Sequence, residues 1–175
     1  GYSCTGYEIP GAIGAKMADP SREVFVFLGD GTYQMMSSEI VTAVQEGIKL
    51  IIVLVDNHGF ASIGGLSESI GSAGFGTRYR ERSNSTGQLD GKNLAVDYVA
   101  NARSLGAQAT KAGSLTELQE ALARAKSSKQ TTVIGVETDR EVRVPGYESW
   151  WDVRSAAVSE RQALPEPLSR YGKAR

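Results

Sequence analysis

Two polar residues that follow apolar segments, Asp30 and Asn57, carry the oxygen atoms best suited to chemistry in this sequence. Asp30 lies between two glycines in the segment VFLGDGTYQ (26–34), and 25 residues, 32 to 56, separate the second glycine from Asn57. Glycines beside the carboxylate allow a ligand to approach the backbone closely. Carboxylate and amide oxygens suit Mg²⁺, which completes its octahedral shell with water or phosphate oxygens. The pair therefore predicts a site for Mg²⁺ and a diphosphate.

Such a site requires that both residues lie at the same edge of a sheet. The apolar segments 23–29 and 49–57 are predicted as buried strands of a parallel sheet, with a helix over 37–47 between them. Asp30 and Asn57 would then follow neighbouring strands at the carboxyl edge, where open α/β sheets bind ligands. An Asp-Gly hairpin turn is the alternative at Asp30. It requires a second strand at once, where the sequence predicts a helix.

The rest of the chain continues the alternation of helices and strands. The remaining predicted elements are helices over 95–106 and 114–128 and strands over 107–113 and 131–138. Ser114 and Glu117 form the pattern of a capping box, and the glycine- and serine-rich residues 59–93 are predicted as a functional or mobile loop. The pattern indicates an α/β fold with a doubly wound, mainly parallel sheet and helices on both faces. We expect one cofactor-binding domain over 1–145 and a tail over 146–175 that packs on it or is partly disordered.

Composition places the chain among ordinary globular proteins. Its 175 residues are 41% hydrophobic and 22% charged, with a formal net charge of −1, so nucleic acid and anionic membrane surfaces are not expected partners. No apolar run approaches the roughly 20 residues of a membrane-spanning helix. The single cysteine, Cys4, excludes an internal disulfide and fits a cytoplasmic location. The chain begins without Met inside a glycine-rich passage, and we expect it to be a fragment of a longer enzyme.

The spacing of Asp30 and Asn57 resembles the diphosphate-binding motif of thiamine-diphosphate-dependent enzymes. The opening segment GYSCTGYEIPGAIGA resembles the segment of that family that lies along the aminopyrimidine ring. This resemblance implies a C-terminal, diphosphate-binding domain with thiamine diphosphate and Mg²⁺ as cofactors, and Asp30, Asn57 and the carbonyl of Gly59 as the metal ligands. The cofactor-binding residues that it implies are Ser3, Cys4, Thr5, Gly29, Asp30, Gly31, Thr32, Asn57, Gly59 and Phe60.

Three residues of these segments have alternative interpretations. The family position of Thr5 usually holds Leu, Ile or Met, which wedges the cofactor into its bent conformation, so this role is not carried over to a smaller polar residue. Cys4 also fits the role of a small buried hydrophobic residue. His58, the single histidine, is a candidate catalytic acid–base residue beside the cofactor, unless its side chain points away from the pocket.

Three further segments narrow the resemblance: YEIPGAIGAKMADP, DNHGF and GYESWWDV (146–153) resemble the trihydroxycyclohexanedione acylhydrolases of inositol catabolism. The implied reaction is hydrolysis of a carbon–carbon bond in a cyclic 1,2-diketone. The alternatives are an acetolactate synthase-like carboligase or decarboxylase acting on 2-oxo acids, and a non-catalytic domain that retains the fold. A nucleotide-binding α/β domain is a weaker alternative, because neither a G-x-G-x-x-G nor a P-loop pattern is present.

The family resemblance also implies partners. The glutamate that activates the pyrimidine belongs, in this family, to a separate pyrimidine-binding domain supplied by a partner subunit. We therefore expect a homo-oligomer that acts on a small-molecule substrate, and we expect the present chain alone to be inactive.

Overall fold

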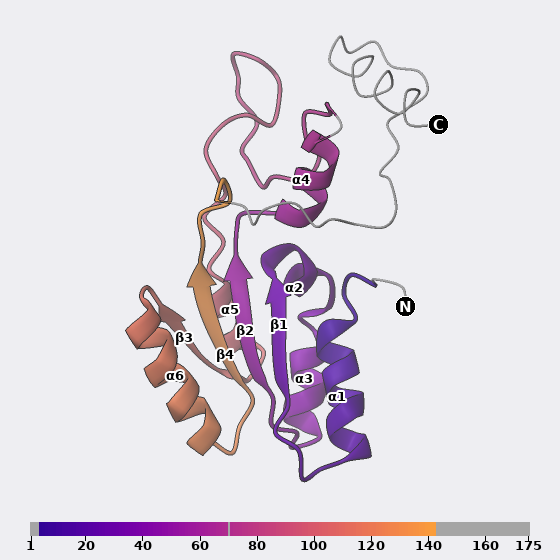
Figure 1. The fold of residues 1–175 in the computed structure, drawn as a ribbon, viewed down its shortest axis with the longest axis vertical. Coiled ribbons are helices and arrows are strands. Elements are labelled where there is room, and N and C mark those ends of the chain that lie inside the picture. The colour runs from indigo at the N-terminus through magenta and orange to yellow at the C-terminus, as the bar shows by residue number, and fades with distance from the viewer. Residues whose placement is uncertain (1–3, 70, 143–175) are drawn as a thin grey trace, which may run out of the picture. The chain divides into compact units, whose positions relative to one another are not determined.

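The computed structural model describes residues 4–69 and 71–142, which belong to two compact units. The first unit runs to Gly59 and resumes from Leu94 to Asp139, and the second holds Phe60–Asn93 and the chain from Arg140 onward. The helices and strands of both units are labelled in Figure 1. The predicted boundary between residues 145 and 146 lies outside the described residues and stays a prediction.

Four parallel strands form the sheet of the first unit, in the order β1-β2-β4-β3 (Figure 1). Their bounds are β1 Phe25–Gly29, β2 Ile51–Asp56, β3 Gln108–Ala112 and β4 Thr132–Glu137. Strands β1 and β2 pair from Phe25 opposite Ile51 to Gly29 opposite Val55. The two strands predicted to be neighbours therefore lie side by side, and Asp30 and Asn57 directly follow their carboxyl ends.

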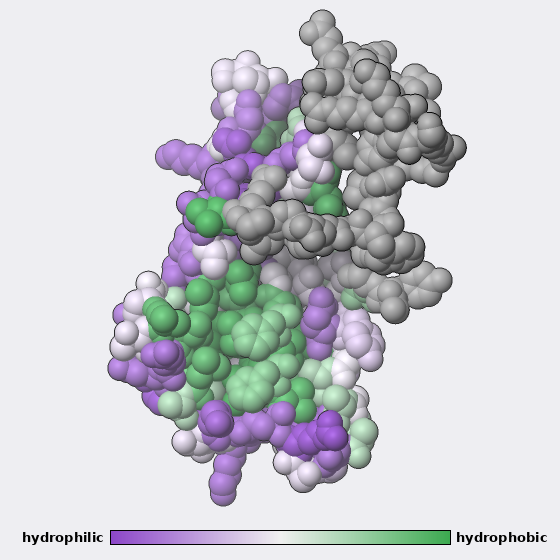
Figure 2. Space-filling model, in the orientation of Figure 1, coloured by the Kyte–Doolittle hydropathy of each residue, from purple (hydrophilic) through white to green (hydrophobic). Residues whose placement is uncertain are grey.

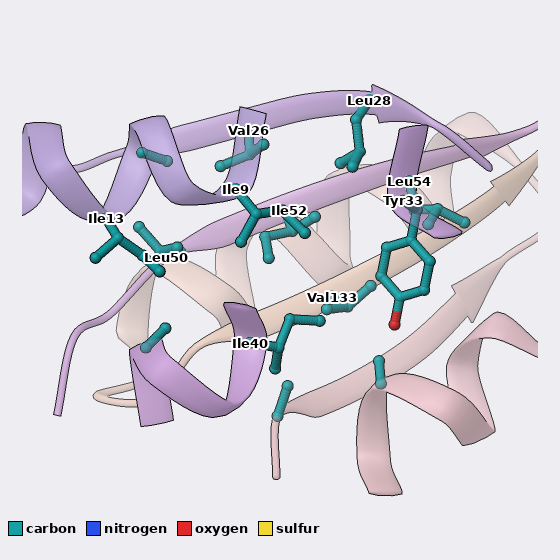
Figure 3. Packing of buried hydrophobic residues seen from close by; sticks show 14 of the residues in the cluster. Ile9, Ile13, Val26, Leu28, Tyr33, Ile40, Leu50, Ile52, Leu54 and Val133 are labelled. Carbon is teal, nitrogen blue, oxygen red and sulfur yellow. The ribbon is translucent and has the colours of Figure 1, made fainter. Parts of the chain in front are cut away.

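Helices cover both faces of this sheet, which confirms the predicted fold class. The helices of the first unit are α1 Glu8–Ala18, α2 Asp30–Met36, α3 Glu39–Gln45, α5 Tyr98–Ser104 and α6 Leu115–Ser127. On one face, residues of α1, α2, α3 and α5 pack against β1, β2 and β4 in one hydrophobic cluster. Figure 3 shows Ile9, Ile40 and Ile52 in this cluster. On the other face, Ile51 and Ile134 pack against the α6 side. None of the described helices is long and apolar enough to span a membrane.

The face that α6 covers is left partly open over β1. Val26 and Leu28 point into the first cluster, so Phe25 and Phe27 point to the opposite face, where they are 43% and 66% exposed. Figure 2 shows hydrophobic side chains gathered over the strands beside α6. Parallel sheets are usually covered on both faces. This exposed strip is therefore a hydrophobic surface of the first unit.

Two helices differ from the sequence prediction. Helix α2 begins at Asp30, directly after β1, whereas the sequence predicted one later helix over 37–47; α3 fills only part of that range. Helix α4, Ala61–Ser69 in the second unit, lies inside the predicted loop. Its segment has no sustained apolar period, and at Gly64 a Cβ atom would lie 2.7 Å from Oγ1 of Thr77. Close tertiary packing, which a local pattern does not show, accounts for a glycine within this helix.

Arginine side chains organise the loop that follows α4. Arg80 donates from Nε to the carbonyl of Gly91 (2.7 Å), and Arg82 donates to the carbonyl of Gly87. Arg78 forms ion pairs with Glu68 and Glu141. The predicted loop 59–93 is thus held by hydrogen bonds between guanidinium groups and its own carbonyls as well as by α4.

Candidate functional site

Asp30 is the first residue of α2 and is fully buried. Its Oδ2 atom accepts the backbone N–H of Gly59 at 2.7 Å, and Oδ1 accepts the N–H of Asn57 at 3.4 Å. Burial raises the pKa of this carboxyl and nearby Asp56 acts in the same direction, while the two backbone N–H groups oppose the shift. Among the ion pairs formed by residues 4–69 and 71–142, none involves Asp30. A buried carboxylate without a cationic side chain can accept a metal ion.

The side chain of Asn57 faces the other two predicted metal ligands. One terminal atom of its amide lies 2.9 Å from the carbonyl oxygen of Gly59 and 3.2 Å from Oδ1 of Asp30. Nitrogen is the assignment that satisfies hydrogen bonding within the chain alone, because the amide then donates to both oxygens. If that atom is oxygen, three oxygen atoms from Asp30, Asn57 and Gly59 face one another, and a cation among them satisfies all three. The arrangement fits a metal ligand set of one carboxylate, one amide and one carbonyl.

A tight turn at the end of β2 brings these ligands together. His58 has φ of 57°, a left-handed conformation that is uncommon for residues other than glycine, and Gly59 has φ of 137°. The backbone N–H of His58 donates to Oδ1 of Asp56 at 3.1 Å. The turn directs the N–H of Gly59 toward Asp30. Its geometry therefore depends on a strained residue at position 58.

The imidazole of His58 lies between two carboxylates at the ends of β2 and β4. Its Nε2 is 3.3 Å from Oε1 of Glu137, and its Nδ1 is 3.6 Å from Oδ1 of Asp56. Glu137 also forms an ion pair with Lys111 at 2.9 Å, and the hydrogen bond from Lys111, followed by that from His58, lowers the pKa of Glu137. The acid–base role of His58 stays a prediction, with the ring held by groups of this chain.

Gly29, Gly31 and Thr32 adjoin Asp30 at the start of α2. Gly31 is buried and Thr32 half-buried, and a Cβ atom built on Gly29 would meet no atom within 4 Å. Open space at Gly29 leaves room for a group of a ligand next to the carboxylate. These three predicted cofactor-binding residues therefore lie together with Asp30.

The predicted residues of the opening segment lie in a turn before α1. Cys4 and Thr5 are exposed, and the carbonyl of Cys4 accepts the N–H of Tyr7 at 3.1 Å. The alternative that Cys4 is a buried hydrophobic residue is therefore wrong, because the turn leaves its side chain outside the core. Ser3 lies outside the described residues. Phe60 belongs to the second unit, where its ring packs edge-on against Tyr79 with centroids 5.8 Å apart.

Two polar side chains near Asp30, those of Tyr98 and Gln34, are not predicted as site residues by the sequence. The hydroxyl of Tyr98, on α5, lies 3.5 Å from Oδ2 of Asp30, and Nε2 of Gln34 donates to that hydroxyl at 2.7 Å. Gln34 lies four residues after Asp30, so recognition of α2 would have placed both on one helix face. Tyr98 is 68 residues away in sequence, and no local pattern relates it to the motif.

The arrangement can hold a divalent cation with few charged residues. No three His, Cys, Asp or Glu side chains within the part of the chain that the structure describes are grouped as a metal site. A site at Asp30 instead combines one anionic oxygen with neutral amide and carbonyl oxygens. Such a set leaves coordination positions for the oxygens of a phosphorylated ligand.

Comparisons with known proteins agree with the resemblance to thiamine-diphosphate-dependent enzymes. Residues 1–136 match the family model described as thiamine pyrophosphate enzyme, C-terminal TPP binding domain. Similar curated proteins include 3D-(3,5/4)-trihydroxycyclohexane-1,2-dione hydrolases of Bacillus cereus (strain AH820), 44% identical, and of Bacillus thuringiensis (strain Al Hakam), 45% identical, each over 164 residues. Each alignment covers 94% of this chain and 26% of the relative. The chain thus spans about a quarter of the length of the curated relatives that it matches.

Solved structures with a similar fold include two decarboxylases. The thiamine diphosphate-dependent 4-hydroxybenzoylformate decarboxylase of Rhodococcus jostii RHA1 aligns with a TM-score of 0.62 and 23% identity, over 77% of this chain and 23% of that one. The benzoylformate decarboxylase of Polynucleobacter necessarius aligns with a TM-score of 0.61 and 27% identity, over 79% of this chain and 24% of that one. These likenesses support the α/β fold described above.

Proposed function

The chain belongs to the thiamine pyrophosphate enzyme family, as a C-terminal TPP-binding domain, and we propose that it holds the diphosphate of thiamine diphosphate through Mg²⁺. Asp30, Asn57 and the carbonyl of Gly59 would be the metal ligands. One observation carries this proposal: the amide of Asn57 faces Oδ1 of Asp30 and the carbonyl oxygen of Gly59 at 3.2 and 2.9 Å. This convergence of polar atoms from the ends of two neighbouring strands supports the proposed ligand set.

Each residue of the site has a distinct task under this proposal. Asp30 supplies the negative charge that a divalent cation requires, and its burial keeps competing water away from the metal. The N–H of Gly59 fixes Oδ2 of that carboxylate. Gly29, Gly31 and Thr32 would leave space for, and contact, the diphosphate. Ser3, Cys4, Thr5 and Phe60 are proposed to contact the remainder of the cofactor.

We further propose that the full-length protein hydrolyses a carbon–carbon bond of a cyclic 1,2-diketone, trihydroxycyclohexanedione, within inositol catabolism. Support comes from curated relatives with that hydrolase name, 44% identical over 94% of this chain. Thiamine diphosphate supplies a centre that accepts the electron pair released by such a cleavage. Action on a 2-oxo acid is the second candidate, since the structural neighbours are named as benzoylformate-type decarboxylases.

We also propose the partners that the rest of the cofactor requires. Because the chain spans about a quarter of its curated relatives, the pyrimidine half of the cofactor is proposed to contact a pyrimidine-binding domain of a partner subunit in a homo-oligomer. The present chain alone would then be inactive. An activity assay of the full-length protein against trihydroxycyclohexane-1,2-dione, pyruvate and benzoylformate separates the substrate candidates, and inactivity with all three would contradict an enzymatic role.

The metal site is tested by Asp30→Ala in the full-length protein. A methyl group cannot replace an anionic ligand, so Mg²⁺-dependent binding of thiamine diphosphate should weaken by at least about 100-fold, beyond the effect of outer partners. Isothermal titration with and without Mg²⁺ measures this change. Asp19→Ala is the matched control, because Asp19 is an exposed carboxylate that pairs with Arg22 in the turn after α1. Equal cofactor affinity in Asp30→Ala and the wild type would refute the assignment.

A further inference from the structure

We propose that Tyr98 is a positioning residue that orients the carboxylate of Asp30 for the metal ion. The inference rests on the proposed function, since it concerns the same metal site. Tyr98 is the first residue of α5 and is 6% exposed, and its hydroxyl lies 3.5 Å from Oδ2 of Asp30. A tyrosine hydroxyl that is buried beside a carboxylate can donate a hydrogen bond to one of the carboxylate oxygens.

Gln34 sets the direction of this contact. Its Nε2 donates to the phenolic oxygen of Tyr98 at 2.7 Å. A phenolic oxygen that accepts a hydrogen bond keeps its own O–H group for donation, and Oδ2 of Asp30 is an acceptor 3.5 Å from it. Gln34, Tyr98 and Asp30 therefore form a short chain in which each group donates to the next.

The hydrogen bonds to Asp30 distinguish its two carboxylate oxygens. Oδ2 receives the N–H of Gly59 at 2.7 Å and the hydroxyl of Tyr98 at 3.5 Å. Oδ1 is the oxygen that faces the amide of Asn57 at 3.2 Å, among the proposed metal ligands. Two donors on Oδ2 restrict rotation of the carboxylate about its Cβ–Cγ bond. This restriction keeps Oδ1 directed toward the cation.

A second buried tyrosine provides an internal comparison. Tyr33 is 1% exposed and packs edge-on against Tyr98, with ring centroids 5.7 Å apart. Its hydroxyl donates to Oδ1 of Asn101 at 2.8 Å, and burial raises its pKa to about 12. Tyr33→Phe therefore removes a buried hydroxyl of the same helix pair without removing a donor to Asp30, and it is the matched control for Tyr98→Phe.

The test measures metal affinity in the full-length protein, with wild type, Tyr98→Phe and Tyr33→Phe. Partners of metal ligands typically change metal affinity by about 10- to 100-fold, and the long 3.5 Å contact places the expected loss near the lower end. Mg²⁺ titrated at fixed thiamine diphosphate should give an apparent Kd about 10-fold higher in Tyr98→Phe and within about 2-fold of wild type in Tyr33→Phe. With Mn²⁺ as the probe, electron paramagnetic resonance should report an altered metal environment in Tyr98→Phe only.

The outcomes separate this inference from the proposed function. In the first outcome, Mg²⁺-dependent binding is present in wild type, absent in Asp30→Ala and unchanged in Tyr98→Phe. The positioning role of Tyr98 is then wrong, while the metal site at Asp30 is supported. Equal weakening by both tyrosine variants would also overturn the positioning role, because general loss of packing would then explain the effect. If wild type and Asp30→Ala bind the cofactor equally, the metal site is wrong and the role of Tyr98 falls with it.

Discussion

The amino and carboxyl edges of the sheet in the first unit differ in how their buried polar atoms are paired. At the amino edge, the hydroxyl of Thr131, a 2% exposed residue, donates to the carbonyl of Ile48 at 2.7 Å and accepts the N–H of Leu50 at 3.2 Å. Lys49 nearby donates to Glu23 and to the carbonyl of Lys126. The polar groups of this edge are satisfied by one another, so they contribute to stability without a ligand.

At the carboxyl edge, the buried carboxylate of Asp30 accepts hydrogen bonds from Gly59 and Asn57, but no ion pair of the described residues neutralises its charge. Oxygen atoms of Asn57 and Gly59 can face the same point. The named polar groups of the amino edge are thus paired within the chain, whereas the charge of Asp30 at the carboxyl edge is the one that we propose a cation neutralises. Residues that break the ordinary rules of burial are characteristic of functional sites.

The largest effect that sharpens this contrast is expected for Asn57→Leu. Leucine has no oxygen to offer a metal, so Mg²⁺-dependent binding of thiamine diphosphate should fall by more than about 100-fold. The fold should be largely retained, because the side chain of Asn57 is half-buried at the surface of the edge. Calorimetric titration of the full-length protein, together with circular dichroism, measures both properties. Unfolded protein, or unchanged affinity, would contradict the proposed division between the edges.

Thr131→Val is the corresponding change at the amino edge. Valine has nearly the same shape but leaves the N–H of Leu50 and the carbonyl of Ile48 without their partner, which should cost about 1–3 kcal/mol of unfolding free energy. Cofactor affinity should not change. Urea denaturation measures the stability, with Thr110→Val, whose hydroxyl makes only a 3.4 Å contact, as the control expected within about 0.5 kcal/mol of wild type. A large loss of cofactor affinity in Thr131→Val would show that the edges are not independent.

Local patterns in the sequence were sufficient to predict much of both edges. The continuous apolar run before Asn57 predicted β2, and its pairing with β1 is confirmed. Ser114 caps α6 as predicted, by accepting the N–H of Glu117 at 3.2 Å. The carboxylate of Glu117 accepts the N–H of Gly113 rather than that of Ser114, so the capping box is only half formed. Predictions succeeded where residues a few positions apart determine the geometry.

Features that depend on distant residues could not be predicted. Tyr98 lies near Asp30 because α5 packs on the same sheet face as α2. The two residues are 68 positions apart in sequence, so no pattern around Asp30 indicates Tyr98. The left-handed φ of His58 results from its position between β2 and Gly59, and histidine itself only tolerates this conformation. Cys4 was open to two interpretations because the turn before α1 decides its exposure.

Substitutions of His58 separate backbone conformation from acid–base chemistry at the carboxyl edge. His58→Val places a β-branched residue at φ of 57° and should cost about 1–2 kcal/mol of unfolding free energy. It should also weaken cofactor binding several-fold through the turn that positions Gly59. Asparagine tolerates the left-handed region, so His58→Asn should retain cofactor affinity in the same titration.

Turnover of His58→Asn then tests the predicted acid–base role. Loss of a general acid–base group typically lowers turnover by about 10²- to 10⁴-fold. A loss of that size at unchanged cofactor affinity supports the role, and wild-type turnover excludes it. Equal cofactor affinity in His58→Asn and His58→Val would contradict the proposed importance of the turn.

The smallest expected effect concerns the charge of Asp30 itself in protein free of cofactor and metal. Burial raises its pKa above the unfolded value of about 3.9, although the N–H groups of Gly59 and Asn57 offset part of the shift. The stability linked to a raised pKa is fully present below the unfolded pKa and is lost as pH rises through the folded pKa. Asp30→Asn removes this titration, so its stability relative to wild type should increase between pH 4 and pH 7. Urea denaturation with a chelator at both pH values measures the change. Asp19→Asn provides the control of opposite sign at lower pH, because hydrogen bonds from Ser21 and Arg22 lower the pKa of Asp19, so that its stability relative to wild type should decrease as the pH rises from about 3 to about 5. If Asp30→Asn followed Asp19→Asn in sign, the carboxylate at the carboxyl edge would already be neutralised within the chain, and the contrast between the two edges would fail.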